Sequence, residues 1–153
     1  MSYNYDPELA SMLEFLPDGA MDLTDPVGTR AAFLEMTAQL NAGLDRGGVV
    51  VDDRNIPGRD GDPEVPLRIY SPQGLATVVP GILHLHGGGF VVGNLDSELG
   101  ACLALCRALG VVVVSVDYRL APEHPYPAAV DDAEAALRWL LEHAAEVGID
   151  PAR

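Results

Sequence analysis

Apolar residues recur at helical spacing in two segments near the N-terminus, and each segment begins with an Asp-Pro pair. Aspartate is a good N-cap, and proline suits the first helical position. The first helix is predicted from Asp6-Pro7 to about residue 16, where Pro17-Asp18-Gly19 stops it. The second is predicted from Asp25-Pro26 to about Leu44, and its apolar positions are Val27, Ala31, Leu34 and Ala38. We therefore predict a helical cap region over residues 1–46.

The pattern then changes to one typical of strands. Val49-Val50-Val51 and the alternating segment 65–70 are predicted to form an antiparallel pair across a Gly- and Pro-rich loop. Residues 78–85 form a continuous apolar run, which predicts a buried strand. The β-branched run Val111–Val116 predicts another strand that is buried on both faces.

Two further helical patterns separate and follow these strands. The first is predicted to start with Asp96 as its N-cap and to stop at Gly110, and the second to end at Gly148. The order strand, glycine loop, helix, strand, helix is typical of an α/β fold with a mostly parallel sheet. Residues 47–153 are therefore predicted to form the core.

His86-Gly87-Gly88-Gly89 directly follows the apolar run that ends at Leu85. Glycine reaches backbone conformations that other residues avoid, so such a loop can direct several N–H groups at one point. Donors arranged in this way stabilise the negative charge that develops on a carbonyl oxygen during acyl transfer. A loop of this type forms part of the oxyanion hole in lipases and esterases.

Two other interpretations of this region stay open. Gly87, Gly89 and Gly93, with Asp117 after the next strand, form an imperfect dinucleotide-binding pattern. His84 and His86 are spaced as two metal ligands could be, but no further His or Cys completes a set, so we expect no metal site.

Composition excludes several classes of partner. The chain has 153 residues and a formal net charge of −14, which argues against binding to nucleic acid or to an anionic membrane surface. The sequence holds no apolar stretch of roughly 20 residues, the length that a membrane-spanning helix needs. The first residues lack the basic and apolar regions of a signal peptide, so a cytoplasmic location is expected.

The glycine loop and the later segment Asp117-Tyr118-Arg119-Leu120-Ala121-Pro122-Glu123 together resemble the hormone-sensitive-lipase-like family of α/β-hydrolases, the class IV (GDXG) esterases. Gly148-Ile149-Asp150-Pro151-Ala152-Arg153 resembles the same family's approach to its next strand. The resemblance implies an α/β-hydrolase fold, a small-molecule ester substrate and no cofactor. It implies oxyanion-hole N–H groups at Gly88 and Gly89, and a supporting role for six further residues: His86, Gly87, Asp117, Tyr118, Arg119 and Glu123.

The sequence departs from that family at the nucleophile. Members carry a G-D-S-A-G-G elbow followed by an acid and a histidine, and no serine here has glycines two residues away on both sides. We therefore expect the N-terminal half of a carboxylic ester hydrolase, with an incomplete fold and no activity alone. A non-catalytic binding or assembly module is the alternative, and self-association through an exposed edge at residues 81–85 is expected.

Overall fold

The computed structural model describes residues 6–8, 22 and 24–153. The helix predicted from Asp6 to about residue 16 therefore lies almost entirely outside the described residues. The division into a cap region and a core at residue 46 stays a prediction. None of the described helices is long and apolar enough to cross a bilayer.

Four strands form one sheet in the order β1-β2-β4-β3. They are β1 (Val49–Ile56), β2 (Val65–Pro72), β3 (Gly81–Leu85) and β4 (Val112–Val116). The predicted antiparallel pairing of β1 with β2 is confirmed, but the described sheet is mixed rather than mostly parallel, because β2 is also antiparallel to β4. Only β3 and β4 are parallel. These two strands are the neighbours joined by a crossover helix, which a parallel pair requires.

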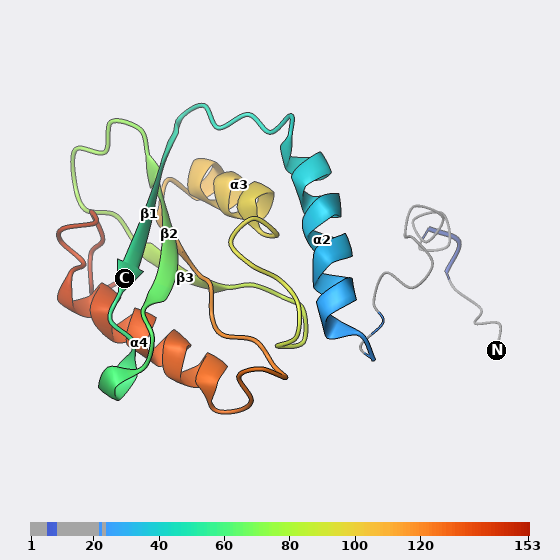
Figure 1. Ribbon diagram of the computed structural model, residues 1–153. Helices are drawn as coiled ribbons and strands as arrows, with labels where there is room; N and C mark the ends of the chain where they lie inside the picture. The colour runs from blue at the N-terminus through green and yellow to red at the C-terminus, as the bar shows by residue number, and fades with distance from the viewer. Residues whose placement is uncertain (1–5, 9–21, 23) are drawn as a thin grey trace.

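Helices cover both faces of the sheet (Figure 1). Successive residues of a strand point to opposite faces. Val113 packs with α3 (Leu99–Leu109), whereas Val112 and Val114 pack with α4 (Ala128–Glu142). All five residues of β4 are buried, as the β-branched run predicted.

The starting and ending points of these two helices differ from the predictions at two places. Helix α3 begins at Leu99, not at Asp96, because the Asp96 carboxylate pairs with Arg68 at 2.6 Å instead of capping the helix. Its predicted end is confirmed, since Gly110 is left-handed with φ 64°. Helix α4 ends at Glu142, six residues before Gly148, which is also left-handed (φ 78°).

Helix α2 (Pro26–Asn41) lies to one side of the sheet, beside the loops that precede α3 and α4 (Figure 1). The Asp25 side chain caps it, as predicted, by accepting from the N–H of Gly28 at 3.0 Å. The apolar positions Val27 and Leu34 are not buried, at 66% and 47% exposed, and Leu34 lines a cleft between the helix and these loops. The helix instead turns its threonines and Arg30 inward, since it meets loop carbonyls there rather than an apolar sheet.

Candidate oxyanion hole

The glycine loop leaves the sheet at the carboxyl end of β3. Leu85 of β3 is level with Val116 of β4, so the loop that starts at His86 and the segment that starts at Asp117 emerge side by side. Ligand sites of open α/β sheets lie at this end of the strands. The structure therefore brings together the two motifs that the sequence separates by about thirty residues.

Gly88 occupies a position that only glycine can fill. Its φ is 121°, and a Cβ atom there would lie 2.1 Å from the carbonyl oxygen of Val92. Gly89 is also left-handed, with φ 60°, but nothing lies within 4 Å of its hypothetical Cβ. Gly87 has neither a positive φ nor a neighbour within 4 Å. The backbone thus requires glycine most strongly at position 88.

Hydrogen bonds fix the orientation of the peptide unit between Gly88 and Gly89. The Gly88 carbonyl accepts from the N–H groups of Val91 and Val92, both at 3.1 Å. A trans peptide is planar and its N–H points opposite to its C=O, so the Gly89 N–H points away from these two amides. Within the described part of the chain, the N–H groups of Gly88 and Gly89 donate no backbone hydrogen bond. They are available to an external acceptor.

His86 and Tyr118 contact each other at the start of the loop. The Tyr118 hydroxyl donates to the His86 carbonyl at 2.7 Å, and the two rings stack with centroids 4.0 Å apart. Burial raises the pKa of Tyr118, so its hydroxyl keeps the proton that it donates. His86 Nδ1 lies 2.8 Å from the Gly87 carbonyl, which can only accept, so this nitrogen carries the proton.

Gly93 matters because of its contact with His86, which the sequence analysis did not anticipate. Its φ is 106°, and a Cβ atom there would lie 2.2 Å from His86 Nδ1. In the dinucleotide interpretation Gly93 would instead lie at the start of a helix. Helix α3 begins only at Leu99, so the glycines do not open a helix and that interpretation is wrong.

Arg30 of α2 is the residue of this site that sequence reasoning missed. Its Nε donates to the Val91 carbonyl at 2.7 Å, and Nη2 donates to the Ala121 carbonyl at 2.5 Å. Both Nη atoms also bind the carboxylate of Glu123, each at 2.8 Å. This hydrogen bonding lowers the pKa of Glu123 to about 2. No local signal marked Arg30, because its partners are 61 to 93 residues away in the sequence.

Arg119 and Asp117 lie near the loop but have other contacts. The Arg119 guanidinium binds Asp132 of α4 and, at 2.8 Å, Asp62. Arg119 therefore attaches the segment 117–123 to α4. Asp117 is half-buried, and burial raises the pKa of its carboxyl group. Its backbone N–H donates to the Pro66 carbonyl at 3.0 Å.

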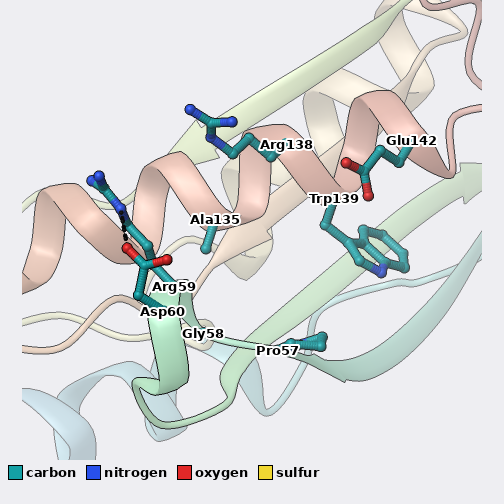
Figure 2. Close-up of a pocket in the computed structure, with 8 residues that line it drawn as sticks. All are labelled: Pro57, Gly58, Arg59, Asp60, Ala135, Arg138, Trp139 and Glu142. Atoms are coloured by element: carbon teal, nitrogen blue, oxygen red, sulfur yellow. Dashed lines mark hydrogen bonds and ion pairs between the residues drawn. The ribbon is translucent and has the colours of Figure 1, made fainter.

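His84 and the hollow beside α4 are separate from this site. His84 Nε2 lies 3.8 Å from Glu98, and no group of three or more potential metal ligands occurs among the described residues. A hollow of about 380 Å³ lies between α4 and the segment 57–60. Figure 2 shows the residues that line it, among them Arg59 bound to Asp60. None of its lining residues belongs to the glycine loop or to the segment 117–123.

Comparison with known proteins agrees with this architecture. Residues 82–153 match a family model described as the α/β hydrolase fold. The structure superposes on a bacterial heroin esterase with a TM-score of 0.91 and 42% identity, over 97% of this chain and 46% of the esterase. The chain has the α/β-hydrolase fold. The resemblance and the fold class inferred from the sequence are thereby confirmed.

Two further relatives of this chain are esterases by name. The chain is 47% identical to the carboxylesterase NlhH of Mycobacterium tuberculosis, over 67% of this chain and 32% of the relative. It is 38% identical to the ethyl acetate hydrolase of Pseudomonas putida, over 100% of this chain and 50% of the relative. The chain thus spans at most about half the length of the relatives that it matches.

Proposed function

We propose that this chain contributes the oxyanion-binding loop of a carboxylic ester hydrolase. The observation that carries the proposal is the glycine loop itself: at the carboxyl end of β3, the N–H groups of Gly88 and Gly89 have no backbone acceptor among the described residues. The esterase names of the relatives support the substrate class, a small-molecule ester.

The proposed reaction uses a serine, a histidine and an acid that lie outside these 153 residues. The serine Oγ attacks the ester carbonyl and its proton passes to the histidine. The carbonyl oxygen becomes an oxyanion, and Gly88 and Gly89 donate their N–H groups to it. Collapse expels the alcohol, which takes the proton from the histidine, and water then releases the acid from the acyl-enzyme. No step calls for a metal or an organic cofactor.

The 153-residue chain alone is expected not to hydrolyse activated esters above a matched background. An oxyanion donor contributes on the order of 3 kcal/mol to a transition state, but only where a nucleophile generates that state. The measurement is turnover of p-nitrophenyl acetate and butyrate by purified protein. Saturable hydrolysis that a serine reagent abolishes would reveal a nucleophile within this chain.

Completion of the chain tests the proposal directly. The C-terminal half of a close relative, beginning at the strand before its serine elbow, is fused after Arg153. We expect the fusion to hydrolyse short-chain esters, and substitution of the elbow serine by alanine to abolish the activity. A folded fusion that binds an ester analogue and does not turn over esters would contradict the proposal.

A second candidate function, a non-catalytic assembly module, rests on the outer edge of β3. Gly81 donates to the Arg153 carbonyl at 3.2 Å, but in the described residues β3 otherwise pairs only with β4. Leu85, the last residue of β3, is 48% exposed. An unpaired apolar edge is a template for pairing with another chain.

Self-association through this edge is therefore expected despite the charge of −14. Light scattering should show species larger than a monomer, and Leu85→Lys should reduce them because charge on an edge strand opposes pairing. Val50→Lys is the matched control, since Val50 is 52% exposed on β1 at the opposite edge. A monodisperse monomer for the unsubstituted chain would refute the expectation.

A further inference from the structure

Helix α2 reaches the core through polar contacts with loops. At one end of the helix, Arg30 binds the segments around Val91 and Ala121. At the other end, the Asn41 side-chain amide donates to the Asp96 carbonyl at 2.8 Å. A cleft of about 320 Å³ lies between α2 and these loops, and Arg30 and Asp117 both line it. The contacts between the helix and these loops therefore include directed hydrogen bonds at both of its ends.

The acceptors of Arg30 lie on both segments that flank the glycine loop. Val91 follows the loop directly, and Ala121 belongs to the neighbouring segment. These two segments are also joined to each other, because the Ala121 N–H donates to the Phe90 carbonyl at 2.9 Å. Phe90 has φ 65°, a conformation that is strained for a residue with a side chain and needs support from its surroundings. Arg30 completes that support.

A series of hydrogen bonds connects Arg30 with the Gly89 N–H, a proposed oxyanion donor. Arg30 holds the carbonyl of Val91, and the N–H of Val91 holds the carbonyl of Gly88. The Gly88 carbonyl and the Gly89 N–H belong to one rigid peptide unit. A movement of Val91 away from Arg30 would therefore rotate the Gly89 N–H.

We propose that Arg30 is a positioning residue that couples the docking of helix α2 to the orientation of the Gly89 N–H group. The inference rests on the proposed function for its consequence in catalysis, but the coupling itself is a property of the chain alone. Arginine suits the task because its planar fork donates to several acceptors at once. Lysine, a point donor, cannot reach Val91, Ala121 and Glu123 together in the same geometry.

Amide hydrogen exchange of the 153-residue chain tests the coupling without any activity. The reporters are the N–H groups of Val91, Val92 and Ala121, which are bonded within the loop system. In Arg30→Gln we expect these three amides to exchange about tenfold faster or more. Opening of the loop in the unsubstituted chain must break the hydrogen bonds that the charged Arg30 donates, and in the variant it need not. Arg30→Lys should give an intermediate rate. Unchanged rates in Arg30→Gln would overturn the proposal.

A matched control separates this effect from the loss of any surface arginine. Arg54 also binds two acidic side chains, Asp52 and Glu146, both at 2.7 Å, but it lies away from the glycine loop. Arg54→Gln should leave the three reporter rates unchanged. Glu123→Gln should have a smaller effect than Arg30→Gln, because it leaves both backbone acceptors of Arg30 in place. An equal effect of Arg54→Gln would show general destabilisation and overturn the proposal.

The completed fusion enzyme supplies the kinetic readout. Arg30→Gln is expected to lower kcat about tenfold with little change in KM, since a misdirected oxyanion donor weakens the transition state more than bound substrate. Arg30→Lys should recover part of the loss. If an active fusion keeps its kcat in Arg30→Gln, the coupling to catalysis is refuted. If the fusion is inactive with Arg30 in place while the exchange result holds, the proposed function fails and the coupling stands.

Discussion

Replacement of Gly88 by valine in the completed enzyme is expected to lower kcat by about a hundredfold or more, the usual size of an oxyanion-hole loss. Its φ is 121°, and a Cβ atom would lie 2.1 Å from the Val92 carbonyl oxygen, so the substitution must displace the loop. KM should change much less, because the interaction belongs to the transition state and not to bound substrate. Steady-state hydrolysis of p-nitrophenyl butyrate measures both constants.

Gly87→Ala is the matched control for this prediction. Gly87 lies in the same loop, its φ is not positive, and no atom lies within 4 Å of its hypothetical Cβ. Its kcat should therefore stay close to that of the unsubstituted fusion. Circular dichroism and denaturant unfolding of both variants separate a local effect from loss of the fold. If a folded Gly88→Val fusion hydrolyses esters equally well, the role assigned to the loop is wrong.

The sequence predicted well those features that depend on a contiguous run of residues. The run at Val111–Val116 is apolar and β-branched, so it identified the buried strand β4 without any knowledge of its neighbours. The glycine loop and the segment from Asp117 are also contiguous motifs. They follow the neighbouring parallel strands β3 and β4, and Tyr118 contacts His86 where they lie side by side.

The features that were missed depend on partners distant in sequence. The apolar spacing of α2 marked Val27 and Leu34, yet both are exposed, whereas Arg30 binds the neighbouring loops. The helical pattern alone does not reveal the Val91 carbonyl, the acceptor of Arg30 that lies 61 residues away. The start of α3 was missed for a similar reason, since Asp96 is a good N-cap by type but binds Arg68 instead.

Asp132, which forms an ion pair with Arg119, is another residue whose role the sequence did not reveal. Arg119 belongs to a recognised motif, but its partner lies 13 residues later on the buried face of α4, in a pattern that otherwise predicts apolar residues. The Asp132 side chain is 1% exposed and accepts from the Arg119 backbone N–H and from its guanidinium, at 2.8 to 3.0 Å. A buried carboxylate requires such partners.

Asp132→Ala is therefore expected to lower the free energy of unfolding by about 1–3 kcal/mol, because the Arg119 backbone N–H and guanidinium lose their buried acceptor while Asp62 still pairs with the guanidinium. Urea denaturation of the 153-residue chain measures the loss. Arg138→Ala is the control: its pair with Glu134 is an exposed i,i+4 pair with Arg138 70% exposed, and such pairs contribute only about 0.3–0.5 kcal/mol. Since Arg119 directly follows Tyr118, Asp132→Ala should also loosen the hydroxyl contact to His86. Equal stability losses in the two variants would show that the buried pair has no special role in holding this segment to α4.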